Sequence, residues 1–255
     1  METTDKISVV INTYNAEEYL AKALEAVKEF DEIVVCDMES TDSTLDIARR
    51  YGCKIVTFPK ENHKSAEPAR TFAIQSASSK WVLVVDSDEI ITPELKEYLY
   101  SMIKKKECPA GLYIARRNMF IGKFSKDWSH DYQLRFFIRE GTVWPPYVHT
   151  FPTVQGRVER APSKYKMLHL ADESIQRWAQ KMNEYTDNEA VKKANRNYGV
   201  FALCWRPAWY FLRSYIFSGG FRSGKRGFIS AILSANYQTV VISKMIEKRM
   251  RDKMK

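Results

Sequence analysis

Short apolar segments alternate with amphipathic ones along the first hundred residues. Four segments are rich in Val and Ile, at positions 7–12, 32–37, 54–58 and 81–85. Between them apolar residues recur at helical spacing, as in Leu20, Leu24 and Val27. Continuous apolar segments are typical of parallel strands buried on both faces, and short connections between alternating strands and helices imply right-handed crossovers. The pattern therefore predicts an α/β fold with a mostly parallel sheet flanked by helices.

The pattern changes after residue 170, where longer helical segments follow. Positions 174–196 carry apolar residues on one side of a predicted amphipathic helix. Residues 201–217 are mostly aromatic or aliphatic, but Arg206, Pro207 and Arg213 interrupt them, and the uncharged run at 227–243 is shorter than the roughly 20 residues of a membrane span. We therefore predict a first domain at 1–170 and a helical, basic extension at 171–255, with a bend at 218–225 and no transmembrane helix.

Carboxylates gather where the fourth apolar segment ends. Asp86, Asp88 and Glu89 follow positions 81–85 directly. Open α/β sheets bind ligands at the carboxyl ends of their strands, and crowded carboxylates repel one another unless a hard cation lies between them. The spacing by itself is weak, because 12 Asp in 255 residues produce Asp-x-Asp about 0.6 times by chance. The alternative is a solvated turn that opens the next helix.

Charge is unevenly distributed over the chain. Residues 1–156 hold 20 basic and 23 acidic residues, whereas residues 157–255 hold 20 basic and 8 acidic ones, so the net charge of +9 comes from the C-terminal part. This asymmetry favours an anionic partner, either nucleic acid or anionic lipid. An aromatic segment interrupted by arginines and followed by a basic end is typical of helices that lie on a membrane surface. A helical subdomain packed on the first domain, with an ordinary basic surface, is the alternative.

Cysteine spacing and short motifs narrow the class of protein. The four cysteines are far apart and form no Cys-x-x-Cys pair, as expected of reduced core residues rather than disulfides or a zinc site. The N-terminal residues show no apolar signal segment, so a cytoplasmic protein is expected. No Gly-x-Gly-x-x-Gly follows the first predicted strand, and no Gly-x-x-x-x-Gly-Lys-Ser/Thr occurs. These absences argue against NAD-type dinucleotide binding and against a P-loop NTPase.

Four separate segments together resemble family 2 glycosyltransferases, which have the GT-A fold. They are SVVINTYN at 8–15, EIVVCDMESTDST at 32–44, PAR at 68–70 and DSDE at 86–89, in the order and spacing of that family over roughly residues 6–100. A second block, DYQLRFF at 131–137 with Val148-His149 and His169-Leu170, is similar to the branch that includes lipopolysaccharide core glucosyltransferases. Thr150 stands where that branch usually has Glu, and Met38-Glu39 replaces the usual small residues of the second segment. The particular sugar is therefore not carried over.

The resemblance implies a metal-dependent, inverting enzyme with a nucleoside diphosphate sugar, most readily a UDP-sugar, as donor. The residues implied for nucleotide-sugar binding are Thr13, Asn15, Glu17, Asp37, Arg70 and Asp86, and those implied for binding Mg²⁺ or Mn²⁺ are Asp86 and Asp88. Structural alternatives stay open for Asn15 as a helix N-cap, for Asp37 as a turn-forming acid and for Arg70 as an exposed helix arginine.

Inversion at the anomeric carbon needs one carboxylate that takes the proton of the acceptor hydroxyl. Asp131 is the candidate, because it precedes the apolar segment 134–138 and stands where the resembling family has an acid facing the acceptor. Asp127, Glu89 and His149 compete with it for this role. His149 and His169 are flanked by apolar residues, which is more typical of packed, hydrogen-bonded histidines than of metal ligands.

Together these features predict that the protein transfers a sugar to a saccharide or lipid-linked acceptor in the synthesis of cell-envelope polysaccharide or lipopolysaccharide. We expect the protein in the cytoplasm, peripheral on the inner face of the cell membrane, with an anionic membrane surface as partner of the extension. Nucleic acid is not expected, because no recognised nucleic-acid motif is present. The competing functions are a non-catalytic relative that binds a nucleotide sugar and, less favoured, a basic nucleic-acid-binding protein.

Overall fold

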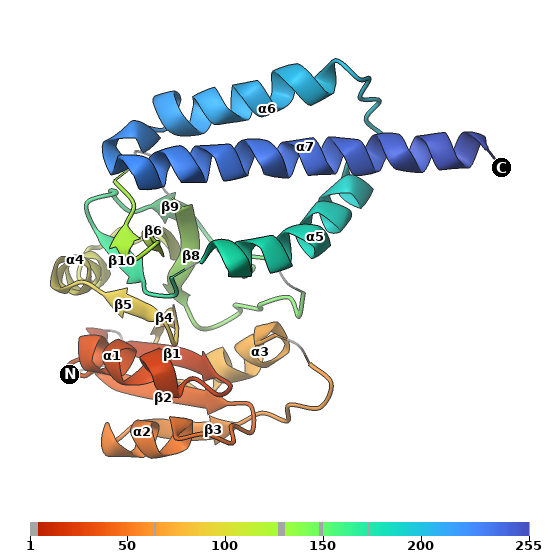
Figure 1. Ribbon diagram of the computed structural model, residues 1–255. Helices are drawn as coiled ribbons and strands as arrows, with labels where there is room; N and C mark the ends of the chain where they lie inside the picture. The colour runs from red at the N-terminus through yellow and green to blue at the C-terminus, as the bar shows by residue number, and fades with distance from the viewer. Residues whose placement is uncertain (1–4, 64, 127–130, 148–149, 173, 255) are drawn as a thin grey trace. The chain divides into compact units, whose positions relative to one another are not determined.

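The computed structural model describes residues 5–63, 65–126, 131–147, 150–172 and 174–254 (Figure 1). The chain forms two compact units, each taken by itself below. The sheet unit comprises Met1–Arg117 and His130–Ala171, and the helical unit comprises Asn118–Ser129 and Asp172–Lys255. The helical unit therefore combines the C-terminal helices with a short segment from the middle of the chain.

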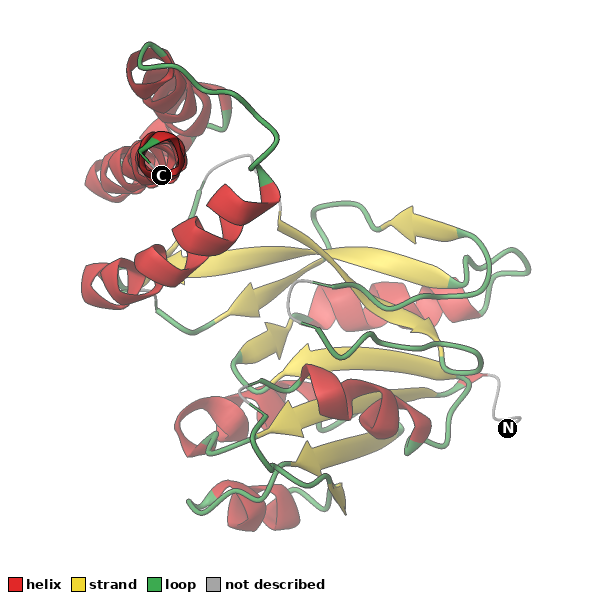
Figure 2. Ribbon diagram, turned by 90° about the vertical axis from the view of Figure 1, so that its right-hand side faces the viewer, coloured by secondary structure: helices red, strands yellow, loops and turns green. Residues whose placement is uncertain are grey.

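The first part of the sheet unit alternates strands and helices as predicted. Its elements are β1 Ile7–Thr13, α1 Glu17–Val27, β2 Glu32–Asp37, α2 Thr44–Arg50, β3 Lys54–Thr57, α3 Glu67–Gln75 and β4 Trp81–Asp86. The four strands are parallel in the order β3-β2-β1-β4, with helices packed on the sheet (Figure 2). All residues of β1 are buried, because it lies between two strands and under helices on both faces. The predicted α/β class is confirmed.

The strand of the remaining part that pairs with the parallel half runs antiparallel to it. The elements of this part are β5 Glu89–Ile91, α4 Pro93–Ile103, β6 Gly111–Phe120, β8 Asp131–Ile138, β9 Val158–Arg160 and β10 Lys166–His169. β8 lies antiparallel to β4 and to β6, and β10 lies antiparallel to β5. The predicted strand at 134–138 is therefore longer than expected and begins at Asp131 itself.

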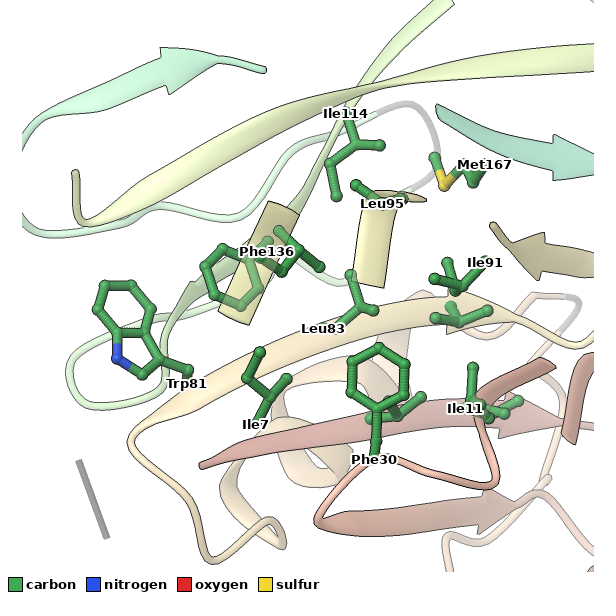
Figure 3. Close-up of a cluster of buried hydrophobic side chains, with 14 of the residues drawn as sticks. Ile7, Ile11, Phe30, Trp81, Leu83, Ile91, Leu95, Ile114, Phe136 and Met167 are labelled. Carbon is green, nitrogen blue, oxygen red and sulfur yellow. The ribbon is translucent and has the colours of Figure 1, made fainter. Parts of the chain in front are cut away.

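Apolar side chains fill both faces of the sheet. On one face Ile7, Ile11, Leu83 and Phe136 pack with residues of α1 and α4 (Figure 3). On this face the ring of Trp81 stacks on that of Phe136, with 5.2 Å between the ring centroids. The other face is covered by α3. Two buried faces hold the strands in register, so their carboxyl ends stay side by side.

The helical unit consists of an antiparallel pair of helices and a third helix beside it. Its elements are β7 Lys123–Phe124, α5 Ile175–Lys192, α6 Ala202–Leu212, the π-helical turn η2 Arg213–Phe217, the 3₁₀ turn η3 Gly220–Ser223 and α7 Lys225–Lys253. α6 runs alongside α7, and α5 also contacts α7 (Figure 1). The predicted helix at 174–196 corresponds to α5, and α6 continues through Pro207.

The bend predicted at 218–225 is confirmed. Gly219 and Gly224 adopt φ values of 75° and 58°, which glycine reaches without steric cost. A Cβ atom at Gly227 would overlap the carbonyl oxygen of Gly220, so the chain can cross itself this closely only without a side chain. Among the described residues, no helix has a stretch both long and apolar enough to cross a membrane.

Candidate active site

The loops after β1 and β2 lie beside each other at the carboxyl edge of the sheet. Thr13 and Asp37 are partners in the strand register, and Thr13 Oγ1 donates a hydrogen bond of 2.8 Å to Asp37 Oδ1. Asp37 is buried and also accepts from the Ser40 amide at 2.8 Å and from Ser40 Oγ at 2.6 Å. The structure therefore brings Thr13 and Asp37 together and uses the carboxylate to shape the loop.

Asn15 and Glu17 connect the two loops through exposed hydrogen bonds. Asn15 does not cap α1, so the structural alternative of a helix N-cap is wrong. Its backbone is left-handed, with φ of 46°, and its Oδ1 instead accepts from the Thr41 amide at 2.8 Å. Glu17 accepts from the Ser43 amide at 3.1 Å. These cross-links hold the two loops at a fixed separation.

Asp86 is held by two buried arginines. It lies beside Asn12 in the strand register. Arg70 Nη2 is 2.8 Å from Asp86 Oδ1, and both terminal nitrogens of Arg135 bond the two carboxylate oxygens. Arg70 is only 7% exposed, so the alternative of an exposed helix arginine is wrong. Burial opposes the charge on Asp86, but the two guanidinium groups outweigh it and hold the pKa of Asp86 well below its usual range.

The ion pairs continue from Asp86 to Asp131 through Glu89. Arg135 Nη2 and Arg116 Nη1 each lie 3.2 Å from Glu89 Oε1. Arg116 then donates from Nε and Nη2 to Asp131 Oδ2, at 2.9 and 2.6 Å. Asp86, Arg135, Glu89, Arg116 and Asp131 therefore form one continuous chain of charges. Burial lowers the pKa of Arg116, but Glu89 and Asp131 raise it further, so it stays protonated.

Glu89 has no exposed surface and is paired with two arginines, so it cannot reach an acceptor as a base. Asp127 and His149, the other rivals of Asp131, lie outside the described residues. Asp131 itself is 35% exposed and also accepts from Gln133 Nε2 at 2.6 Å. Its catalytic role stays a prediction.

Asp88 lies in the turn between β4 and β5, and the structure places His169 next to it. β10 pairs with β5 so that His169 lies opposite Glu89, and His169 Nε2 is 3.2 Å from Asp88 Oδ2. Both side chains are about a quarter exposed, at 23% and 25%. In the described parts of the chain, no group of three or more His, Cys, Asp or Glu side chains could hold a metal ion. The described protein residues therefore offer a cation two ligands, a carboxylate and an imidazole.

Several buried polar atoms around Asp86 have no hydrogen-bond partner among the described residues. They are both amide atoms of Asn12, Nε and Nη1 of Arg70, Nε of Arg135 and Nε1 of Trp144. Arg70 and Arg135 also lie over the Trp144 ring, at 4.6 and 5.8 Å from its centroid. Because buried polar groups nearly always have partners, this concentration indicates a place that takes water or a polar ligand.

Arg116 and Arg135 are not among the site residues predicted from the sequence. A signal was present, since Arg135 stands among Leu134, Phe136 and Phe137, which are apolar. Arginine is almost never fully buried unless it is paired, so an arginine inside an apolar strand indicates an acidic partner. Which acids it pairs with depends on the order of the strands.

We expect Arg135→Met to destabilise the sheet unit by about 3–5 kcal/mol, because it leaves Asp86 and Glu89 buried with too little positive charge. Urea denaturation would measure the loss. Arg49→Met is the control, because Arg49 forms an exposed pair with Asp46 and should cost less than about 1 kcal/mol. A loss below about 1 kcal/mol in Arg135→Met would mean that the ion-pair chain contributes little to the fold.

Because the pKa of Asp86 is low in the folded protein, the free energy of unfolding should decrease at acidic pH. Above the ordinary Asp pKa of about 3.9, Asp86 is ionised in the folded and unfolded states, and its ion pairs stabilise in full. As the pH falls below this value, the unfolded chain binds a proton that the folded chain does not, so the free energy of unfolding decreases. We expect wild type to lose about 1 kcal/mol more than Asp86→Asn between about pH 5 and about pH 3. Equal losses in urea denaturation would contradict this role of Asp86.

Two sequence comparisons cover most of the chain. Residues 8–162 match the family model described as glycosyl transferase family 2. The chain is 28% identical over 267 residues to an uncharacterized glycosyltransferase of Rickettsia conorii, RC0292, covering 98% of this chain and 93% of that protein. It is 27% identical over 251 residues to the lipopolysaccharide core biosynthesis glycosyltransferase LpsC of Rhizobium meliloti, covering 95% and 92%.

Two solved structures share the fold. The mannosyltransferase PcManGT from Pyrobaculum calidifontis, in complex with GDP-Man and Mn²⁺, aligns with a TM-score of 0.58 at 13% identity, covering 94% of this chain and 87% of that one. Residues 1–349 of TarS from S. aureus, in complex with UDP, align with a TM-score of 0.51 at 18% identity, covering 97% and 91%. At these identities the likeness extends to the fold alone.

Proposed function

Because the chain belongs to glycosyltransferase family 2, we propose that it transfers a sugar with inversion from a nucleoside diphosphate sugar, most readily a UDP-sugar, to a saccharide or lipid-linked acceptor. The observation that carries this proposal is the meeting of Thr13, Asp37 and Asp86 at one edge of the sheet. This is where open α/β sheets bind nucleotides. The likeness to LpsC supports lipopolysaccharide or another cell-envelope polysaccharide as the product.

The donor side of the site is assigned to the loops after β1 and β2. We assign the base and ribose to Thr13, Asn15, Glu17 and Asp37, whose cross-links hold the two loops in place. Arg70 is assigned to the diphosphate. Its Nε and Nη1 are buried and have no partner among the described residues, so hydrogen bonds to a diphosphate bound here would satisfy them while Nη2 bonds Asp86.

A divalent cation, Mg²⁺ or Mn²⁺, fits the residues near Asp88. Such ions are usually held by one or two carboxylates together with substrate phosphates and water, rather than by a complete protein cage. Asp88 supplies a carboxylate, the ligand type that suits both ions, and the imidazole of His169 lies 3.2 Å from it at the edge of the sheet. When bound, the cation would neutralise charge that develops on the departing diphosphate. Both oxygens of Asp86 already bond arginines, so we assign Asp86 to the ribose side and Asp88 to the metal.

Asp131 is assigned as the base. Inversion needs a single carboxylate that removes the proton of the acceptor hydroxyl as that oxygen attacks the anomeric carbon. Arg116 donates two hydrogen bonds to one carboxylate oxygen of Asp131, which also fixes the direction in which the other oxygen points. Arg116 is in turn held by the buried Glu89. The base is thereby connected to the arginines around Asp86 and cannot reorient independently of them.

We expect one nucleoside diphosphate to raise the melting temperature of the protein in the presence of Mn²⁺. A ligand at about 100 times its Kd adds about 2.7 kcal/mol to the free energy of unfolding. UDP, GDP, ADP and dTDP would be compared with and without Mn²⁺, and release of the nucleoside diphosphate from the matching sugar donor would then be measured. An oligonucleotide is the control for non-specific binding to basic residues. Stabilisation by the oligonucleotide alone would overturn the proposal, and binding without turnover would indicate a non-catalytic relative.

A further inference from the structure

One face of α6 exposes a continuous row of large apolar side chains. The row, called the α6 face below, consists of Phe201 directly before α6, Trp205, Trp209 and Leu212 on α6, and Ile216 in η2, with exposed fractions between 41% and 88%. At 3.6 residues per turn, the first four fall within an arc of about 80°, and the row is about 22 Å long. Isolated apolar residues on a surface need no explanation, but an aligned row of this size marks an interaction site.

A different side of α6, together with the turn η2, is in contact with α7. The rings of Phe211 and Tyr215 meet that of Phe228 on α7, with centroids 5.6 and 5.5 Å apart. Ala202 on the same helix is buried. α6 therefore packs on α7 through side chains that do not belong to the row. The α6 face is not needed for the packing of this helical pair.

The charged residues in the segment of the chain that carries the α6 face have a single sign. Residues 190–246 contain nine basic and no acidic residues. The Arg206 guanidinium lies over the rings of Tyr198 and Trp205, at 4.8 and 5.4 Å from their centroids, which holds it at the border of the row. Arg213 and Arg222 are exposed in the turns that follow. Apolar side chains edged by arginines match a surface that is apolar inside and anionic at its boundary.

We propose that the α6 face docks on an anionic lipid bilayer, with α6 parallel to the membrane plane and its tryptophans at the boundary between the lipid headgroups and the acyl chains. A second copy of the chain is disfavoured as the occupant, because it would bring the same positive charges against each other. Nucleic acid would match the arginines but not the row of apolar side chains. The inference rests on the proposed function, because a lipid-linked acceptor would explain why the enzyme binds a membrane. Lipid binding itself can be measured without donor or acceptor.

The test is co-sedimentation of the full chain with vesicles of phosphatidylcholine, with and without phosphatidylglycerol. We expect binding to the vesicles that contain phosphatidylglycerol, weakened by salt and reduced at least about tenfold in Trp205→Glu/Trp209→Glu. Val191→Glu is the matched control, because Val191 is an exposed apolar residue of α5 outside the α6 face, and it should bind like wild type. Circular dichroism would establish that each variant keeps its helices.

A second measurement uses only the wild-type protein. Brominated acyl chains in the anionic vesicles should quench its tryptophan fluorescence, which requires indole rings near the acyl boundary. Absence of vesicle binding, equal binding of wild type and the double variant, or absence of quenching would each overturn the inference. So would a dimer in solution that the double variant dissociates. Nucleoside diphosphate release measured without vesicles tests the proposed function separately, so failure of one is distinguishable from failure of the other.

Discussion

Asp88→Asn is expected to lower turnover of the sugar donor about 10³-fold, equivalent to about 4 kcal/mol of transition-state stabilisation. The substitution keeps the shape of the side chain but removes its negative charge, which is the anionic protein ligand proposed for the cation. The diphosphate would then leave without the charge compensation that a bound cation supplies. Release of the nucleoside diphosphate, measured with Mn²⁺ at saturating donor, reports the change.

Binding separates this role of Asp88 from a structural one. The additional thermal protection that Mn²⁺ gives to the nucleoside diphosphate complex should disappear in Asp88→Asn, while protection by the nucleotide alone persists. Asp46→Asn is the matched control, because Asp46 is an exposed acid of α2. It should retain both activity and Mn²⁺-dependent protection. Turnover within about threefold of wild type in Asp88→Asn would rule out Asp88 as a metal ligand that the reaction needs.

Asp131→Asn is expected to lower sugar transfer about 10³-fold, within the range that a positioned general base contributes. The amide can still accept from Arg116, so the geometry of the ion-pair chain should be largely kept. Because the change concerns the acceptor proton, protection by the nucleoside diphosphate and Mn²⁺ should be unaffected. Transfer from a labelled donor to a saccharide-lipid extract measures the effect.

The pH profile distinguishes a base from a positioning residue. Wild-type transfer should fall on the acid side as the base becomes protonated, and this limb should be absent from the residual activity of Asp131→Asn. Asp127→Asn and His149→Gln test the rival assignments and should keep transfer within about tenfold of wild type. If one of them loses activity and the acid limb while Asp131→Asn keeps them, the base is the rival residue.

The parallel half of the fold was predictable because local signals and global structure agree there. Continuous apolar segments such as 81–85 have one stable place, between two strands and under helices, and alternation with helices then forces parallel order. The same alternation puts Thr13, Asp37 and Asp86 at one edge. The family resemblance assigned them to the nucleotide, and the family match is confirmed. The individual roles stay predictions.

Local propensity was a poor guide where long-range contacts compete with it. Asn15 precedes a helix and is a favoured capping residue, yet its side chain bonds the Thr41 amide of the facing loop. His169 was interpreted as a packed, hydrogen-bonded histidine, and its Nε2 does lie 3.2 Å from Asp88 Oδ2. That partner could not be predicted from the neighbours of His169 in sequence, because the pairing of β10 with β5 brings the two together. Arg116 and Arg135 could be suspected of having acidic partners, but Asp86, Glu89 and Asp131 could be identified as those partners only from the antiparallel strands β6 and β8.

The sequence by itself determined the α/β class, the acids at the ends of the parallel strands and the basic C-terminal extension, because each depends on residues within one or two elements. Only the tertiary structure decided which charges meet. Asp88 and His169 are 81 residues apart in sequence, and Arg135 and Asp86 are 49 apart. Such contacts depend on strand order and register, and a pattern of apolar positions predicts that a residue is buried without predicting what it is buried against.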